Sequence, residues 1–341
     1  MLEECWQHDA HNSESEIRER EENTIDRRIG EESGSAAGLA SASQVEWRFP
    51  GGEMSGTQKV VLITGGTEGL GKAAAVLLAE RGYRVFAAGR SERKRQELDA
   101  FAAGKKLSIE TVEMDVCNDA SVTSAVQGVL QKAGAIDVLV NNAGIGYMAA
   151  VEELRLEDLR RQFETNLFGV LRVTQAVLPH MRDRKRGRIL MMSSVAGLIA
   201  PPTYGAYSSS KFALEGLSSS LRLELYPFGI EVILIEPGYI VTSFQQTAKD
   251  LAKEYVEAAP NGPYAKVYAG AWVGANKGRE SSKTTPEDCA RVMLDAIEAS
   301  NPKARYPVTA LAKWAAFGKR ILPDAVIDIL LRRKFGIKRE A

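Results

Sequence analysis

Residues 59–82, KVVLITGGTEGLGKAAAVLLAERG, decide the fold of this chain. Residues 59–64 are rich in Val, Leu and Ile, as in a buried strand, and residues 70–82 have the composition of a helix. The glycine-rich turn between them favours a pyrophosphate, because the free N–H groups and the dipole at a helix N-terminus attract an anion. The spacing G-x3-G-x-G is not the commonest dinucleotide fingerprint, so a merely tight turn remains the alternative at this point.

Apolar runs alternate with helical stretches over the following 150 or so residues. The expected strands are residues 59–64, 84–89, 107–116, 136–142, 187–194 and 230–237. The expected helices are residues 70–82, 91–103, 119–133, 156–184 and 205–228. Each helix is long enough to cross over and begin the next parallel strand. The pattern predicts an α/β fold, a doubly wound parallel sheet of Rossmann type with six to seven strands and helices on both faces. Residues 305–308 would be the seventh strand, confined to an edge by Pro307.

The composition is that of an ordinary globular protein. Of the 341 residues, 45% are hydrophobic and 26% are charged, and no apolar run approaches the roughly 18 residues of a membrane-spanning helix. The acidic opening MLEECWQHDAHN lacks the pattern of a secretory signal, so we expect a cytoplasmic protein. Three cysteines and three histidines are scattered without metal-ligand spacing, which predicts no metal site. The formal net charge is zero, and we expect no nucleic-acid partner.

Both ends of the chain differ from the part between them. Residues 1–55 mix charge runs with small polar residues, which predicts a disordered extension, and we expect Met54 to be the natural initiator. Residues 56–308 are expected to form the globular domain. Residues 309–341 predict two amphipathic helices divided at Pro323, with a basic and apolar surface suited to peripheral contact with an anionic membrane. The alternative is that this surface packs over the substrate cleft or against a second subunit.

Polar residues that can carry chemistry follow the later strands. Residues 141–144, NNAG, close the fourth strand at the edge of the sheet where open α/β folds bind ligands. Tyr207 and Lys211 lie four residues apart in a predicted helix, which places the phenol and the ammonium on one face. Ser194 ends the fifth strand, thirteen residues before Tyr207. Each feature taken alone also fits a plain structural explanation, a turn or a surface pair.

In combination these motifs resemble the short-chain dehydrogenase/reductase family, in its single-domain branch, over about residues 58–308. Residues 64–71 are similar to the family's TGxxxGxG loop, and residues 141–144 to its NNAG motif. The stretch LEGLSSSLRLELYPFGIEVILIEPG and the long tail most resemble hydroxysteroid and retinol dehydrogenases. By resemblance the catalytic residues are Asn166, Ser194, Tyr207 and Lys211. The same resemblance assigns cofactor binding to Gly65, Thr67, Glu68, Gly69, Leu70, Gly71, Arg90, Asp115, Val116, Asn142, Ala143, Gly144, Tyr207, Lys211, Pro237, Gly238, Ile240 and Thr242.

The resemblance implies an oxidoreductase that moves a hydride between nicotinamide and a carbonyl or alcohol carbon. A free tyrosine titrates near pH 10, about three units too high for ready proton exchange at neutral pH. We expect Lys211, with the positive charge of oxidised nicotinamide, to lower the pKa of Tyr207. Ser194 would polarise the substrate oxygen. By resemblance Lys211 also binds the nicotinamide ribose, and Asn166 positions a water that links Lys211 to solvent.

The end of the second strand favours NADP(H), with NAD(H) the less favoured cofactor. An acidic residue at this position would accept from the adenine ribose and repel a 2′-phosphate, but here it is Gly89. Arg90 follows, and then the basic run at residues 93–95, so a guanidinium is available for the phosphate. Glu68 opposes this preference if its carboxylate points inward.

We expect specificity to come from a lid at about residues 243–285 and from the loop LIAPPTY at residues 198–204. Their apolar content favours a lipophilic small molecule such as a steroid, a retinoid or a fatty ketone, although several of these side chains could instead pack in the core. The expected substrate-binding residues are Tyr147, Ser194, Tyr204 and Tyr207. By resemblance, the helices at 156–184 and 205–228 should pair to form a homodimer or homotetramer.

One alternative function is a cofactor-binding redox sensor or scaffold without turnover. Such a protein would have no need to retain the four residues that resemble the catalytic set, and all four are present. An epimerase or dehydratase of the family's longer branch is less favoured, because it would be expected to carry a larger C-terminal substrate domain.

Overall fold

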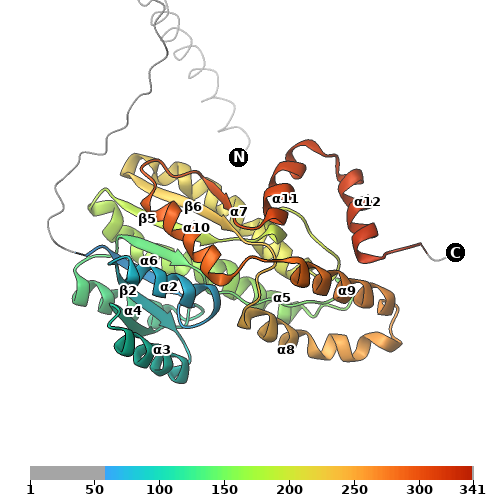
Figure 1. The fold of residues 1–341 in the computed structure, drawn as a ribbon, viewed down its shortest axis with the longest axis horizontal. Coiled ribbons are helices and arrows are strands. Elements are labelled where there is room, and N and C mark those ends of the chain that lie inside the picture. The colour runs from blue at the N-terminus through green and yellow to red at the C-terminus, as the bar shows by residue number, and fades with distance from the viewer. Residues whose placement is uncertain (1–57, 340–341) are drawn as a thin grey trace, which may run out of the picture. The chain divides into compact units, whose positions relative to one another are not determined.

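The computed structural model describes residues 58–339, so the predicted extension at residues 1–55 and the proposed initiator Met54 lie outside the described residues. Seven parallel strands form one sheet in the order β3-β2-β1-β4-β5-β6-β7 (Figure 1). The strands are β1 (Val60–Thr64), β2 (Arg84–Gly89), β3 (Ile109–Glu113), β4 (Val138–Asn141), β5 (Gly187–Met192), β6 (Ile230–Glu236) and β7 (Arg305–Pro307). The predicted fold class is confirmed, with the seventh strand at an edge. The strand order reverses between β1 and β4, and ligands bind at such a point in open α/β sheets.

Helices cover both faces of the sheet. One face carries α2 (Gly69–Glu80), α3 (Glu92–Lys105) and α10 (Pro286–Glu298), and the other carries α4 (Asp119–Ala133), α6 (Gly169–Asp183) and α7 (Gly205–Leu225). Successive residues of a strand alternate between these layers: Ile63 packs against the first and Leu62 against the second. Because both faces are buried, the five inner strands are largely continuous apolar runs, whereas the edge strands β3 and β7 are only partly buried.

The structure corrects the predicted helices at two places. The helix expected at residues 156–184 is divided into α5 (Leu156–Phe163), a π-helical turn η1 (Glu164–Phe168) and α6. The helix α10 was missed, although its start carries a capping box: Asp288 N–H donates to Thr285 Oγ1 at 3.2 Å, and Thr285 N–H donates to Asp288 Oδ2 at 2.8 Å. Pro286 at the first helical position was a further signal.

The lid and the tail gather on one side of the sheet (Figure 1). The lid contains α8 (Ser243–Ala258), a 3₁₀ turn η4 (Ala259–Asn261) and α9 (Ala265–Ser281), and the tail contains α11 (Ala310–Ile321) and α12 (Asp324–Phe335). Shorter 3₁₀ turns are η2 (Val195–Gly197) and η3 (Tyr226–Phe228). Within residues 58–339, no helix has both the length and the apolar character that a membrane span requires.

The tail packs on the lid through the end of α12, and none of its residues lines the cavity described below. Phe335, at the end of α12, is 2% exposed and occupies the space left by two glycines of α9, Gly270 and Gly274. The opposite side of both tail helices remains exposed, including Trp314 and Leu330. The buried residues of the two tail helices are Ala312 and Phe335, and the exposed surface that carries Trp314 and Leu330 is called the free face of the tail below.

Candidate active site

Two turns that are distant in sequence interlock at the point where the strand order reverses. The side-chain amide of Asn142 donates to the backbone oxygens of Thr64 (2.9 Å) and Gly65 (3.0 Å). In return, Thr64 Oγ1 accepts from the backbone N–H groups of Asn142 (2.9 Å) and Ala143 (3.0 Å). The glycine turn after β1 and the NNAG turn after β4 thus form one rigid floor.

The glycine turn has the shape that a pyrophosphate requires. Gly65 has a φ of 61°, a left-handed conformation that favours glycine. A Cβ on Gly71 would lie 2.6 Å from the amide nitrogen of Asn142, so a larger residue would separate the two turns. Glu68, the N-cap residue of α2, makes no side-chain capping bond to the helix. The first N–H groups of α2 are therefore left for an anion.

A cavity of about 820 Å³ extends from this floor to the lid. Among its lining residues are these predicted cofactor-binding residues: Gly65, Glu68, Gly69, Leu70, Asn142, Ala143, Gly144, Tyr207, Lys211, Pro237, Gly238, Ile240 and Thr242. Its lid side is lined by side chains that include Phe244, Ala248, Ala252, Val256, Ala271 and Trp272. One continuous space therefore joins a dinucleotide-shaped floor to an apolar pocket, and the residues present fit a nicotinamide cofactor.

Three predicted catalytic residues meet on one wall of this cavity. The Ser194 hydroxyl, just after β5, hydrogen-bonds to the phenol of Tyr207 on α7. The Lys211 ammonium lies 5.7 Å from the centre of the Tyr207 ring and donates to the carbonyl oxygen of Met192 at 2.7 Å. The helical spacing thus brings the two groups to the same wall, as predicted.

Burial has the largest effect on the pKa values of Tyr207 and Lys211. It raises the pKa of Tyr207 to about 12, although the hydrogen bond from Ser194 acts in the opposite direction. It lowers the pKa of Lys211 to about 8, against the attraction of Glu215. In the protein alone the net pKa of Tyr207 is raised, because desolvation of the phenolate outweighs the hydrogen bond from Ser194. The lowering expected from Lys211 together with the charge of oxidised nicotinamide stays a prediction.

Asn166 lies within the π-helical turn and is fully buried. Its Oδ1 accepts from the N–H of Ile145 at 2.9 Å, and its amide donates to the carbonyl oxygen of Ile145 (3.0 Å) and to Ser210 Oγ (3.2 Å). Asn166 does not line the cavity. It ties the segment after NNAG to the helix that carries Tyr207 and Lys211, and a π turn is frequently found at such functional positions.

Five predicted cofactor-binding residues do not line the cavity: Gly71 in α2, and Thr67, Arg90, Asp115 and Val116 near the ends of β2 and β3. The side chain of Arg90 is 68% exposed, and its guanidinium lies 3.9 Å from Asp115. A Cβ on Gly89 would lie 2.7 Å from Thr67 Oγ1, so a side chain at that position would require Thr67 to move. Close packing is thus one physical reason for a glycine at the end of β2.

Glu68, which was expected to oppose a 2′-phosphate, is neutralised by a neighbour. Its carboxylate pairs with Lys94 at 2.6 Å and hydrogen-bonds to Ser243, the first residue of α8. Burial acts to raise the pKa of Glu68, but these partners outweigh it and lower the pKa. Arg95 is also engaged, because it donates to the carbonyl oxygens of Gly89 (3.0 Å) and Arg90 (2.9 Å).

The structure corrects one expected substrate contact. Tyr204 lines the cavity, but Tyr147 does not: it is buried beside Tyr255 and Tyr268, and its hydroxyl interacts with Arg161. The neighbouring residue Met148 lines the cavity instead. A sequence pattern does not fix the direction of a side chain in an irregular segment.

Sequence reasoning also missed the apolar lining that α8 contributes. Phe244, Ala248, Ala252 and Val256 all line the cavity, and the Phe244 ring centre lies 5.6 Å from that of Tyr207. Their spacing of four residues is the pattern of one helix face, which was the available signal.

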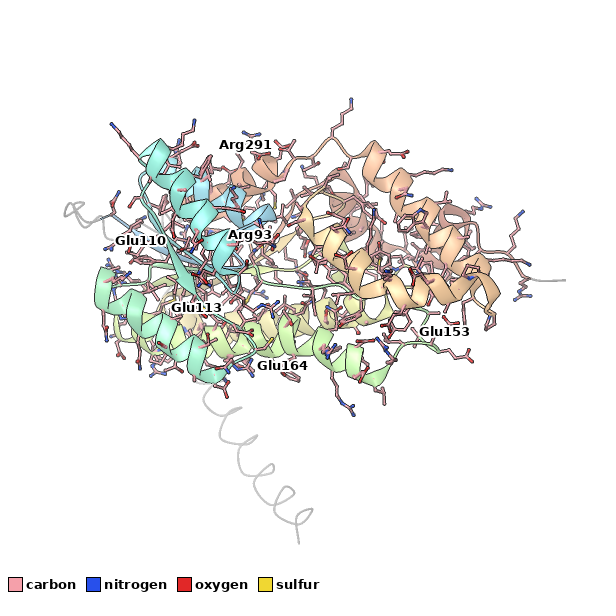
Figure 2. All side chains as sticks on the ribbon, turned by 90° about the horizontal axis from the view of Figure 1, so that it is seen from below. Arg93, Glu110, Glu113, Glu153, Glu164 and Arg291 are labelled. Carbon is pink, nitrogen blue, oxygen red and sulfur yellow. The ribbon has the colours of Figure 1, made fainter. Side chains whose placement is uncertain are left out.

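Tyrosines hold the lid to the segment that precedes α5. The Tyr268 hydroxyl donates to Glu153 at 2.8 Å and accepts from the N–H of Ala150 at 2.9 Å. Glu153 is labelled in Figure 2, at the end of the molecule where the lid lies. Tyr255 donates from its hydroxyl to the buried Asp158 on α5. These hydrogen bonds seat the lid on the segment that ends in α5, and the surface that lines the cavity is mainly apolar.

The sequence and the fold of this chain are similar to those of known dehydrogenases and reductases. The profile of the short chain dehydrogenase family matches residues 59–252. The chain is 34% identical over 283 residues to 3-ketodihydrosphingosine reductase of Bacteroides thetaiotaomicron, covering 82% of this chain and 99% of the relative. It is 35% identical over 258 residues to 17-beta-hydroxysteroid dehydrogenase type 1 of Homo sapiens, covering 73% and 77%. The crystal structure of a short-chain dehydrogenase from Streptomyces avermitilis matches with a TM-score of 0.69 and 31% identity, covering 81% of this chain and 96% of that one. The chain belongs to the short-chain dehydrogenase/reductase family, oxidoreductases that act on CH–OH groups with NAD or NADP.

Proposed function

We propose that this protein is an NADP(H)-dependent oxidoreductase that interconverts a carbonyl and an alcohol on a lipophilic substrate. The observation that carries the proposal is the continuous cavity, in which Tyr207 and Ser194 lie between the glycine floor and the apolar lid. The surface of the cavity is mainly apolar and includes Phe244 and Val256, which favours a lipophilic substrate. Two of the relatives are named for a hydroxysteroid and a ketodihydrosphingosine, which supports a lipophilic class.

In this proposal the cofactor and the protein's own residues act on different atoms of the substrate. When bound, the nicotinamide cofactor supplies or accepts the hydride at the reacting carbon. The chain's own residues act on the oxygen: Ser194 donates a hydrogen bond to it, and Tyr207 gives it a proton in reduction and removes one in oxidation. We assign the pyrophosphate to the N-terminus of α2, and the nicotinamide ribose to Lys211. We assign to Asn166 the support of a proton path from Lys211.

The preference for NADP(H) is assigned to Arg90. Lys94 and Arg95 have close protein partners, whereas the guanidinium of Arg90 is largely exposed and lies 3.9 Å from Asp115. We expect it beside the position of the adenine ribose in this fold. The pairing of Glu68 with Lys94 supports this proposal, because it removes the main repulsion of a 2′-phosphate.

The experiment that tests the function is a cofactor-consumption assay on a substrate panel. Purified protein is mixed with NADPH or NADH and with steroid ketones, retinals, long-chain 3-ketones, quinones or sugars. We expect turnover with at least one lipophilic ketone or aldehyde, and faster turnover with NADPH. Activity confined to sugars would contradict the lipophilic class. Tight cofactor binding with no turnover across the panel would favour the sensor or scaffold instead.

We further propose that this enzyme is a cytoplasmic protein that contacts membranes through the free face of its tail. Trp314, Phe317 and Ile321 form one exposed stripe on α11, and the Trp314 and Phe317 rings pack edge to face at 6.5 Å. Lys313 and Arg320 flank this stripe. Aromatic residues beside cations suit the interface of an anionic bilayer, where a lipophilic substrate would be dissolved.

Vesicle sedimentation tests this contact. Wild-type protein should sediment with vesicles that contain phosphatidylserine, and less so at high salt, because the cationic part of the attraction is screened. Trp314→Ser/Phe317→Ser should stay in the supernatant while retaining its fold, since the two side chains are 72% and 57% exposed. Equal sedimentation of the variant would refute the membrane proposal.

A further inference from the structure

A buried charged network lies behind the catalytic wall and has no part in the mechanism above. It consists of Glu215 on α7, Glu236 at the end of β6 and Arg305 at the start of β7. The two carboxylate residues are 7% and 0% exposed. Burying an ion costs several kcal/mol, about as much as its pairing returns, and apolar packing of equal volume is often as stable. Stability alone is therefore a weak reason for the network.

The network connects three elements of the sheet edge. Arg305 Nη1 donates to Glu236 Oε1 at 2.7 Å and also to Glu215 Oε2. The other carboxylate oxygen of Glu215 accepts from the hydroxyl of Ser193, directly after β5. A chain of charged hydrogen bonds thus runs from β7 through α7 to the end of β5.

The Ser193 end of this chain is the backbone that builds the active site. Ser193 lies between Met192, whose carbonyl oxygen accepts from Lys211, and Ser194, whose hydroxyl meets Tyr207. Glu215 also lies one helical turn after Lys211 on α7, so its carboxylate is near the ammonium.

The Glu236 end reaches the same backbone from the other side. Glu236 directly precedes Pro237, whose carbonyl oxygen accepts from the N–H of Val195 at 2.8 Å and from the Ser194 hydroxyl at 3.5 Å. Both ends of the network therefore converge on Ser194.

We propose that Glu215, held in place by Arg305, is a positioning residue that fixes Ser194 and Lys211 and stabilises the buried Lys211 ammonium. This inference rests on the proposed function, because it assumes that Lys211 acts as a cation beside Tyr207.

The sign of the electrostatic effect follows from the groups around Lys211. Tyr207 and Glu215 on its own helix interact with Lys211 directly. Behind them, Tyr204 acts on Tyr207, and Arg305 on β7 links Glu215 to Glu236 on β6. Burial lowers the pKa of Lys211 to about 8 and Glu215 opposes this, so the ammonium is lost as the pH rises through that value. Without the charge of Glu215, the ammonium is lost at a lower pH.

The test compares Glu215→Gln with Glu224→Gln, an exposed position on the same helix. The pH profile of kcat is measured with the best substrate of the panel, and the pH dependence of NADP⁺ affinity by calorimetry. In Glu215→Gln we expect kcat to fall about tenfold and the alkaline limbs of both profiles to move down by roughly one pH unit. Glu224→Gln should match the wild type.

A third variant separates position from charge. Ser193→Ala removes the hydrogen bond and keeps the carboxylate, so kcat should fall while the alkaline limb stays in place. An unmoved limb in Glu215→Gln would overturn the electrostatic role, and an unchanged kcat in Ser193→Ala would overturn the positioning role. If Glu215→Gln fails to fold, Glu215→Asp replaces it. We expect this variant to have a lower kcat and to keep the alkaline limb of the wild-type pH profile. A shifted alkaline limb or an unchanged kcat in Glu215→Asp would overturn the inference. A wild type without turnover would instead contradict the proposed function, and the calorimetric profiles would still decide the role of Glu215.

Discussion

At the scale of single residues, Arg90 is where cofactor preference can be tested most cleanly. Its neighbour Lys94 is paired with Glu68, and Arg95 donates to backbone oxygens. The guanidinium of Arg90 lies 3.9 Å from the carboxylate of Asp115 and is largely exposed. Arg90→Leu should reduce the ratio of kcat/KM with NADPH to that with NADH by about tenfold or more, because a charged hydrogen bond contributes about 1.5–3 kcal/mol. Steady-state kinetics with both cofactors measures this ratio.

Arg93→Leu is the matched control. Arg93, which is labelled in Figure 2, lies on α3. Its side chain is 73% exposed and pairs with Glu97 at 2.5 Å. Its removal should leave the ratio unchanged, and an unchanged ratio in Arg90→Leu as well would refute the assignment. Gly89→Asp is a poorer probe, because its Cβ would meet Thr67 and disturb the turn itself.

At the scale of elements, the sequence predicted what local chemistry determines. The five inner strands were found because they are largely continuous apolar runs, and the partly buried edge strands β3 and β7 were found as well. The helix α4 was predicted with the bounds Asp119–Ala133 that the structure has. The π-helical turn could not be predicted, since its residues, ETNLF, are ordinary in a helix. It is accompanied by hydrogen bonds from Asn166 to Ile145 and Ser210, which are distant in sequence.

The packing of the tail on the lid is also a property of elements. Phe335→Ala should free the end of α12 from α9, because it removes a buried aromatic side chain, a change that costs about 3–5 kcal/mol in a well-packed core. Hydrogen exchange should rise in both helices, and KM for a lipophilic substrate should rise several-fold. Phe317→Ala, an exposed position on α11, should change neither quantity. Unaltered exchange in Phe335→Ala would show that the contact does not hold the tail.

At the scale of the whole molecule, one face of α7 is exposed and available to a second copy of the chain. Phe212, Gly216, Ser219 and Leu223 form a stripe on this face, with exposed apolar side chains at both ends and small residues between them. Small residues let a second helix approach closely, which supports pairing of two copies. Light scattering at micromolar concentration should give at least twice the chain mass of 37.1 kDa, and Phe212→Arg should reduce it towards a single chain. A monomeric wild type would contradict this assembly.

The sequence also predicted which segments meet in the site, because the motifs follow strands whose order the fold dictates. It did not predict the direction of Tyr147, nor the balance of desolvation that raises the pKa of Tyr207. Both depend on packing between elements that are far apart in the sequence. Such packing is a property of the assembled molecule rather than of any motif.

The central claim is that Tyr207 exchanges the proton with the substrate oxygen, and Tyr207→Phe tests it most directly. The variant keeps the ring against Phe244 and removes only the hydroxyl that meets Ser194. We expect the dissociation constant of NADP⁺, measured by calorimetry, to stay within about twofold, while kcat falls by about 100-fold or more, the usual contribution of a general acid or base. Turnover in Tyr207→Phe at the wild-type rate would contradict the account.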